Sequence, residues 1–249
     1  MNKQERFDVI KKAISERMAP TMGCTGPMAF IHTAAVAAKL AGGKEIKKIV
    51  CRANGKFAAR MGEVVTPGLP EENLELALSI GAIGGIPEHN YEVIKHVSKE
   101  QVDQALALSK SGKVEVIPDW KICDLIYVDV TVETEAGTGR AVEAKGACEV
   151  YLKERNGEVI ERVDYDPYKK NSATEVYPIS QLSTADLYEF ATEVPIEDLA
   201  YIQHSIECNA AIAEYGAKNR VGFGLGVTWD KIASGTEDML LKARALAAA

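Results

Sequence analysis

The stretch YVDVTVETE, residues 127–135, alternates apolar and polar side chains with a period of two. This period is typical of a strand that is buried on one face, because successive side chains point to opposite sides of a sheet. The alternating run as a whole covers residues 124–135, and the same alternation recurs in 113–118, 138–151 and 158–164, with the turn sequences AGTG and RNGE between neighbouring runs. Short turns of this kind join antiparallel strands. The middle of the chain, roughly 113–164, is therefore predicted to form an antiparallel sheet.

Helical patterns lie on both sides of this region. Phe7, Ile10 and Ile14 recur at helical spacing, and the run 29–40 is rich in alanine. The patterns predict a strand at 46–53 and helices at 4–17, 27–41, 71–83, 90–96, 98–111, 184–193, 196–217 and 235–247. Because helices precede and follow the strands instead of alternating with them, the fold class is predicted to be α+β, with helices flanking the sheet. We interpret residues 1–249 as a single α+β unit, with the polar stretch 165–182 as the place for an internal boundary.

Composition limits the class of function. The chain has 249 residues and a formal net charge of −7, which argues against binding to nucleic acid or to an acidic membrane surface. The sequence contains no run of the roughly 18–20 apolar residues that a membrane span requires. The start of the chain, MNKQERFDVIKKA, lacks the apolar core of a signal peptide, so we expect a cytoplasmic location.

Five cysteines without CxxC spacing argue against a disulfide framework. Four of them fall in or beside regular elements and are predicted to be small core residues: Cys51, Cys123, Cys148 and Cys208. Cys24 differs, because the sequence GCTGP at 23–27 places it in a turn at the start of a helix. The helix dipole and the unpaired backbone N–H groups stabilise a thiolate at such a position. Cys24 is therefore a nucleophile, a ligand of an iron–sulfur cluster, or a loop residue without a role.

Other catalytic motifs are weak. GFGLG at 222–226 matches neither GxGxxG nor GxxxxGK[ST], and we interpret it as a turn between helices. The four histidines form no HExxH motif, and His32 is predicted to pack inside the protein or to face a partner. The sequence has no GxSxG motif, and no pair of carboxylates stands out as an acid and a base.

Several segments resemble one family, in the same order and over nearly the whole chain. They are MGCTGPMAFIHTAAVAAKLAGG, LALSIGAIGG, ALSKSGKVEV and ECNAAIAEYGAKNRVGFGLGV. Together they resemble the N-terminal half of the L-cysteine desulfidases, which are related to the α chains of iron–sulfur L-serine dehydratases. Asn209, Glu214 and Gly216 fit the family's pattern of N, E and G before a glycine-rich turn. Gly26 stands where the family motif GCT-E-P has glutamate, and ANGKFAARMG matches the family's G-N-x-x-K-N-style segment only loosely.

The resemblance implies a lyase that acts by β-elimination on a small amino acid. Cysteine would give pyruvate, ammonia and sulfide, and serine would give pyruvate and ammonia. The family's [4Fe-4S] cluster is held by three cysteines and leaves one iron open to the substrate as a Lewis acid. The resemblance implies Cys24 as a cluster ligand, and Thr25, Asn54, Lys56 and Asn209 as substrate-binding residues, but it assigns no general base.

None of the other four cysteines matches a ligand of the family. We therefore expect a hetero-oligomer in which a cysteine-rich second subunit shares the [4Fe-4S] cluster, and a chain that is inactive without that partner. The alternative is a non-catalytic relative that binds an amino acid or acts as a scaffold.

Overall fold

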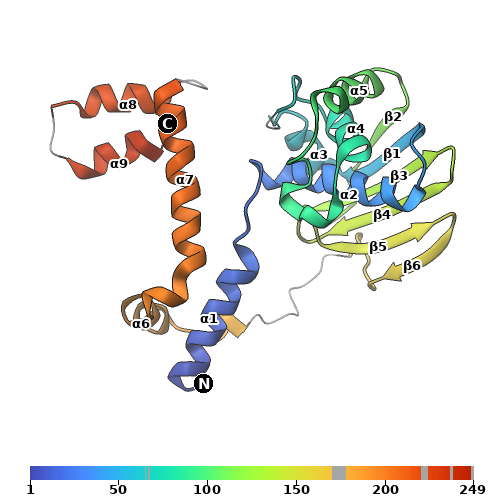
Figure 1. Ribbon diagram of the computed structural model, residues 1–249. Coiled ribbons are helices and arrows are strands. Elements are labelled where there is room, and N and C mark those ends of the chain that lie inside the picture. The colour runs from blue at the N-terminus through green and yellow to red at the C-terminus, as the bar shows by residue number, and fades with distance from the viewer. Residues whose placement is uncertain (65, 67, 170–177, 220–223, 236–237, 248–249) are drawn as a thin grey trace. The chain divides into compact units, whose positions relative to one another are not determined.

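The computed structural model describes residues 1–64, 66, 68–169, 178–219, 224–235 and 238–247 (Figure 1). The chain divides into two compact units. Residues 20–175 form the sheet unit, and residues 1–19 together with 176–249 form the helical unit. The division between residues 175 and 176 falls inside the polar stretch 165–182, and the chain also passes from one unit to the other between residues 19 and 20.

The sheet unit contains strands β1 (Ile46–Asn54), β2 (Val114–Asp119), β3 (Tyr127–Thr134), β4 (Thr138–Ala144), β5 (Val150–Arg155) and β6 (Glu158–Arg162). Its helices are α2 (Thr25–Ala41), α3 (Gly55–Met61), α4 (Leu74–Gly84) and α5 (Lys99–Ser109), with the 3-10 helix η1 (Pro87–Glu92). The helical unit contains α1 (Lys3–Arg17), η2 (Pro178–Gln181), α6 (Thr184–Glu193), η3 (Ile196–Leu199), α7 (Ala200–Asn219), α8 (Leu225–Ala233) and α9 (Met239–Ala247).

The described strands form one sheet in the order β2-β1-β3-β4-β5-β6. The pairs from β1–β3 to β5–β6 are antiparallel, so the predicted α+β fold with a sheet in the middle of the chain is confirmed. The pair β1–β2 is parallel, which the prediction of an antiparallel set missed, because α3, α4 and α5 carry the chain back across the sheet between these strands. The predicted run 138–151 is two strands, and the turn between them contains Lys145 and Cys148 at positive φ.

Helix α2 is the centre of the sheet unit. Thirteen of its 17 residues are buried, because it packs between the sheet and α4. Glycines permit this close packing: a Cβ on Gly81 of α4 would lie 2.2 Å from the carbonyl oxygen of Ile31. A Cβ on Gly139 of β4 would lie 2.1 Å from the carbonyl oxygen of Ala37. Figure 1 shows α2, α3, α4 and α5 together on one side of the sheet.

Two predictions of local structure, one of a helix and one of a turn, need correction. The expected helix at 90–96 is wrong, since the chain there completes η1 and continues in turns, with Asn90 at φ 49. GFGLG at 222–226 is interpreted above as a turn between helices, but Gly224 is the N-cap of α8 and Leu225 begins that helix, while residues 222 and 223 lie outside the described part of the chain. The expected helices at 4–17, 27–41 and 184–193 are confirmed as α1, α2 and α6.

The helical unit has a small core. Phe7 and Ile10 of α1 pack against Phe190 of α6 and Val194, and the two phenylalanine rings meet edge to face with centroids 5.1 Å apart. Arg6 reinforces this contact from α1, with Nε 2.9 Å from a carboxylate oxygen of Asp186. Among the described helices of the whole chain, none is long and apolar enough to cross a membrane.

Candidate functional site

Cys24 lies at the N-cap of α2 and is exposed. Among the described residues, its side chain makes no capping hydrogen bond. Gly23 precedes it at φ 120, a conformation that favours glycine, and Met22 anchors the turn by donating its N–H to the Tyr91 carbonyl at 3.3 Å. The thiol is therefore presented at the surface, at the end of a 17-residue helix where backbone N–H groups lack helical partners.

The first turn of α2 contacts the end of α3. Thr25 is exposed beside Cys24, whereas Gly26 is buried. A Cβ on Gly26 would lie 2.0 Å from Sδ of Met61, the last residue of α3. The methionine side chain thus occupies the space that a larger residue at position 26 would need.

Helix α3 begins with two of the expected site residues, Asn54 at its N-cap and Lys56 in its first turn. Asn54 is buried, and its Oδ1 accepts a hydrogen bond from the Phe57 N–H at 3.0 Å. Its Nδ2 donates to the carbonyls of Ile122 and Asp124, each at 2.9 Å. The amide of Asn54 is therefore engaged in holding α3 to the turn that precedes β3.

Lys56 is exposed and forms no ion pair with another described residue. Met61 follows it by five positions, so the two lie about 7–8 Å apart along the axis of α3 at a rise of 1.5 Å per residue. The sheet unit thus brings Cys24, Thr25 and the α3 helix together, and that helix carries two exposed cations, Lys56 and Arg60, without an ion pair to another described residue.

Asn209 belongs to the helical unit. It is exposed on α7, where its Nδ2 donates to the Ser205 carbonyl at 2.7 Å. Residues 220–223 of the glycine-rich segment that follows in the sequence lie outside the described part of the chain.

The remaining cysteines differ from one another. Cys51 is fully buried in the core, and burial raises the pKa of its thiol far above the usual range. Burial and the nearby Glu143 carboxylate raise the pKa of Cys148 to about 12. Cys123 and Cys208 are exposed, so the prediction of a core position is wrong for both. One lies in a turn after β2, and the other lies on an exposed face of α7.

The described residues contain no group of three or more histidines, cysteines, aspartates or glutamates that could hold a metal ion. Cys24 therefore offers one thiolate without further protein ligands from the described part of this chain.

A buried acid–base pair in the sheet unit was missed by sequence reasoning. His32 of α2 contacts the Glu143 carboxylate of β4 through Nδ1, and its Nε2 lies 2.9 Å from the Pro87 carbonyl oxygen. The second carboxylate oxygen of Glu143 accepts the Cys148 N–H at 2.7 Å. The pair therefore joins α2, β4, the β4–β5 turn and η1.

The electrostatics favour a charged imidazole. Burial by itself lowers the pKa of His32. The hydrogen bond and the charge of Glu143, together with the Pro87 carbonyl, raise the pKa by more than burial lowers it, so the net pKa lies above the usual value. Both ring nitrogens face acceptors, which suits the imidazolium. His32 is 4% exposed and Glu143 is 0% exposed, so the pair is part of the core and does not face a substrate. Strand periodicity could have found Glu143, because it shares the buried face of β4 with Gly139 and Ala141.

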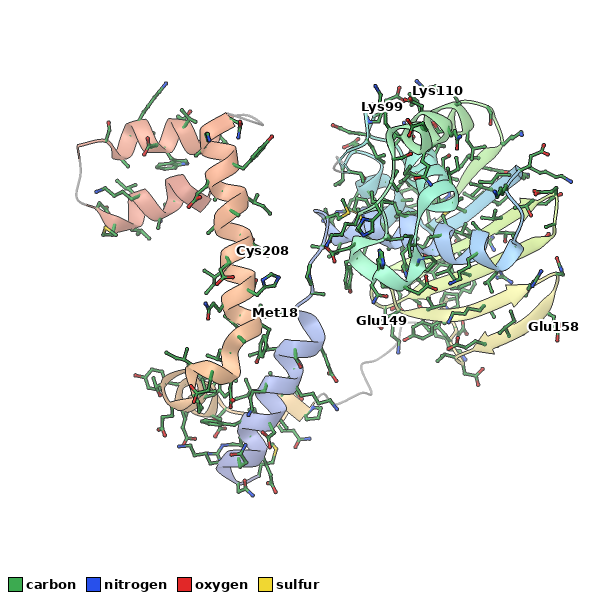
Figure 2. The ribbon with its side chains drawn as sticks, viewed as in Figure 1. Met18, Lys99, Lys110, Glu149, Glu158 and Cys208 are labelled. Carbon is green, nitrogen blue, oxygen red and sulfur yellow. The ribbon has the colours of Figure 1, made fainter. Side chains whose placement is uncertain are left out.

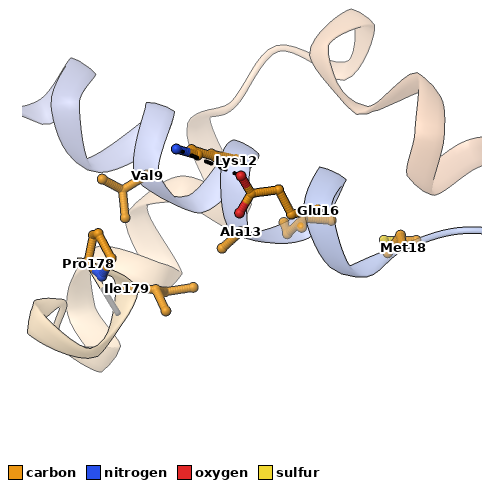
Figure 3. Close-up of a pocket in the computed structure, with 8 residues that line it drawn as sticks. Val9, Lys12, Ala13, Glu16, Met18, Pro178 and Ile179 are labelled. Carbon is orange, nitrogen blue, oxygen red and sulfur yellow. Dashed lines mark ion pairs between the residues drawn. The ribbon is translucent and has the colours of Figure 1, made fainter. Parts of the chain in front are cut away.

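Each of the two units contains a groove. In the sheet unit, a groove of about 650 Å³ lies at the C-terminal end of α2, where Ala38 and Gly42 help to line it. In the helical unit, a mostly apolar groove of about 670 Å³ lies between α1 and η2 (Figure 3). Lys12 and Glu16 form an ion pair at 3.7 Å along this second groove. In the described part of the chain, neither groove is lined by an expected site residue.

The chain is similar to UPF0597 proteins. It is 29% identical to the UPF0597 protein of Vibrio parahaemolyticus over 230 residues, which cover 92% of this chain and 52% of the relative. It is 28% identical to that of Oleidesulfovibrio alaskensis over 218 residues, 88% of this chain and 50% of the relative. It is 30% identical to that of Desulfatibacillum aliphaticivorans over 252 residues, 96% of this chain and 57% of the relative.

The chain thus spans about half the length of the curated relatives it matches. No protein-family model matches it. The names of these relatives state no activity and no substrate, so the residues themselves must support any assignment of function.

Proposed function

We propose that this chain is one part of an iron–sulfur lyase that catalyses β-elimination from a small amino acid, and that a second polypeptide completes the site. The observation that carries the proposal is the exposed Cys24 thiol at the N-terminus of α2. In the reaction, loss of the α-proton and of the β-sulfur of cysteine, or the β-oxygen of serine, leaves 2-aminoacrylate. Uptake of water then gives pyruvate and ammonia, and the leaving group departs as sulfide from cysteine or as water from serine.

In this proposal, the chain provides the cysteine ligand for one of the four irons of a [4Fe-4S] cluster. A [4Fe-4S] cluster is held by thiolates, and the described residues contribute one accessible thiol that lies at a helix N-terminus. The other ligands would come from the cysteine-rich partner. When bound, the cluster would supply a Lewis-acidic iron for the carboxylate or the leaving group of the substrate.

The residues around Cys24 have defined parts in this proposal. Cys24, exposed at the N-cap of α2, presents its sulfur as a ligand for one iron of the cluster. Thr25, the exposed residue that follows Cys24 in the chain, has a hydroxyl that can hydrogen-bond a polar group of the substrate. Lys56, which is exposed in the first turn of α3, provides a positive charge for the substrate carboxylate.

The relatives contain a region that this chain does not match. About half of each relative lies outside the region that this chain matches. We propose that the partner corresponds to that other half, whose cysteines would supply the remaining cluster ligands.

The test is coexpression under anaerobic conditions. This chain is produced together with the part of the Desulfatibacillum aliphaticivorans relative that it does not match, and pyruvate and sulfide release from cysteine, and pyruvate release from serine, are measured. We expect the complex to be active and the separate chain to be inactive. Cys24→Ala should abolish turnover, whereas Cys123→Ala, which removes another exposed thiol, should leave it intact.

Turnover by the separate chain, or full activity of the Cys24→Ala complex, would contradict the proposal. Binding of cysteine or serine without turnover by any form of the complex would favour the non-catalytic relative instead.

A further inference from the structure

We infer that the outer face of the sheet, which is the face opposite α2 to α5, contains a binding site for a small carboxylate. A cavity of about 160 Å³ is lined by residues of β3, β4, β5 and β6 and of the segment that follows β6. Figure 2 labels Glu149, just before β5, and Glu158, the first residue of β6, which locate two of these strands. Nothing in the proposed lyase reaction uses this cavity.

The register of the strands places the cavity on the outer face. Ala141 of β4 belongs to the core that α2 helps to form, so the side chain of its neighbour Val142 lies on the opposite face. Val142 pairs with Leu152 of β5, which in turn pairs with Arg162 of β6. Val142, Leu152 and Arg162 therefore form one row across the outer face, and each of them lines the cavity.

Three tyrosines also line the cavity. The rings of Tyr127 and Tyr165 stack with centroids 6.2 Å apart, and those of Tyr151 and Tyr165 lie 5.1 Å apart. The Tyr165 hydroxyl donates to the Asp124 carboxylate. The hydroxyls of Tyr127 and Tyr151 form no hydrogen bond with another described residue, so both are available to a ligand. Burial raises the pKa of Tyr127, so its hydroxyl keeps the proton that it would donate.

Two guanidinium groups line the cavity, and among the described residues no carboxylate does so. Arg140 donates to the Asp129 carboxylate through Nε at 2.9 Å and through Nη2 at 2.8 Å. Its Nη1 lies 3.6 Å from Glu154. Arg162 forms no ion pair with another described residue, so its guanidinium is the one that is available to a ligand.

These groups favour a small, singly charged carboxylate. A guanidinium donates two parallel hydrogen bonds to a carboxylate, and the tyrosine hydroxyls can donate further ones. The tyrosine rings and the side chains of Val142 and Leu152 provide apolar contacts for the rest of the ligand. The nearby carboxylates of Asp129 and Glu154 disfavour a dianion such as phosphate. The volume of about 160 Å³ corresponds to about five water molecules at about 30 Å³ each, which limits the ligand to a few non-hydrogen atoms.

The test uses the full chain with benzoate as the probe. Benzamide, an uncharged analogue of nearly the same shape, is the control ligand, and binding is measured by calorimetric titration. We expect benzamide to bind at least about tenfold more weakly than benzoate, because it cannot accept charge-assisted hydrogen bonds as a carboxylate does. Arg162→Gln should weaken benzoate binding by about tenfold or more for the same reason. Arg155→Gln is the matched control, because it removes an exposed arginine of β5 that does not line the cavity, and it should leave the affinity almost unchanged.

Nuclear magnetic resonance of a chain with ¹³C-labelled tyrosine rings provides a second readout. Benzoate should shift the signals of Tyr127, Tyr151 and Tyr165, whereas those of Tyr188 and Tyr215, which are exposed in the helical unit, should stay in place. Tyr127→Phe should keep the ring packing and weaken binding severalfold, because it removes one hydrogen-bond donor.

Three results would overturn the inference. They are a failure of benzoate to bind or an equal affinity for benzamide, equal effects of Arg162→Gln and Arg155→Gln, and binding that leaves the signals of the three tyrosines in place. These measurements need neither the partner polypeptide nor lyase activity, so the two proposals can fail separately.

Discussion

The two units of this chain bury their apolar side chains to very different extents. In the sheet unit, residues such as Phe30, Ile49 and Val130 are 0% exposed. In the helical unit, α7 leaves Ile206 63% exposed and Ile212 69% exposed. Large apolar residues are also exposed on η3, α8 and α9 of the same unit: Ile196, Leu225, Ile232, Met239 and Leu240.

This difference in burial suggests that the two units have different roles. The sheet unit builds its own core around α2, and that core fixes the helix whose first turn presents Cys24. The helical unit has a small core around Phe7 and Phe190 and leaves apolar surface of the kind that marks protein interfaces. We therefore expect substitutions in the first unit to affect folding, and substitutions on the second to affect assembly.

The largest effect is expected at the buried pair of the sheet unit. Glu143→Ala leaves the His32 imidazole and the Cys148 N–H without their carboxylate partner in the core. Removing one member of a buried ion pair costs about 3–5 kcal/mol. Urea unfolding should show this loss, whereas Glu133→Ala, at an exposed position on β3, should stay within about 0.5 kcal/mol of wild type. Equal stability of the two variants would contradict the conclusion that His32 and Glu143 form a buried ion pair in the core.

The next effect concerns the close approach of α2 to the sheet. In Gly139→Ala the new methyl would lie 2.1 Å from the Ala37 carbonyl oxygen and 2.4 Å from the Ala41 nitrogen, both of which are backbone atoms. Overpacking of this kind costs about 1–3 kcal/mol. Gly62→Ala is the matched control, because its methyl would meet the Ala58 carbonyl oxygen at an ordinary 3.5 Å. Thermal unfolding should show a lower midpoint for Gly139→Ala than for Gly62→Ala. A Gly139→Ala variant as stable as wild type would show that α2 packs less closely on the sheet than these distances indicate.

A smaller effect should depend on pH. The pKa of His32 is raised in the folded chain, so its protonated form is stabilised by folding. The contribution of this group to the free energy of unfolding is complete below about pH 6.5, the usual pKa of histidine, and is lost as the pH rises through the raised pKa. The urea midpoint of wild type should therefore fall with rising pH more steeply than that of His32→Gln. A wild-type slope that is shallower than that of the variant would indicate a neutral imidazole.

The smallest effect on stability is expected in the helical unit. Ile206→Ala truncates an exposed side chain and should change the free energy of unfolding by no more than about 0.5 kcal/mol. The same substitution at Ile49, which is 0% exposed in the sheet unit, should cost about 2–5 kcal/mol. Calorimetric titration with the partner polypeptide should show weaker binding for Ile206→Ala. Unchanged affinity together with a large loss of stability would reverse the proposed roles of the two units.

Local sequence patterns predicted much of the fold. The alternation in 127–135 and the alanine-rich run before Gly42 were sufficient to place β3 and α2, because each pattern reflects a single element packed on one core. The parallel pairing of β1 with β2 was not predicted, since it joins segments that three helices separate. The helix expected at 90–96 failed because Asn90 adopts a positive φ.

The candidate site was predictable only in part. The turn sequence GCTGP located Cys24 at the start of a helix, because glycine and proline have strong local preferences. The contacts of Asn54 could not be predicted, since its side chain bonds the carbonyls of Ile122 and Asp124, some 70 residues later in the chain. The same holds for the pairing of His32 with Glu143, which is set by the packing of α2 on β4.

The most direct test of the account is the iron content of the anaerobic complex. The chain and the unmatched part of the Desulfatibacillum aliphaticivorans relative are purified together, and iron and acid-labile sulfide are measured per complex. We expect about four irons in wild type and in Cys123→Ala, as one [4Fe-4S] cluster requires, and a clear loss of iron in Cys24→Ala. A Cys24→Ala complex that forms and holds as much iron as wild type would contradict the role of Cys24 as a cluster ligand.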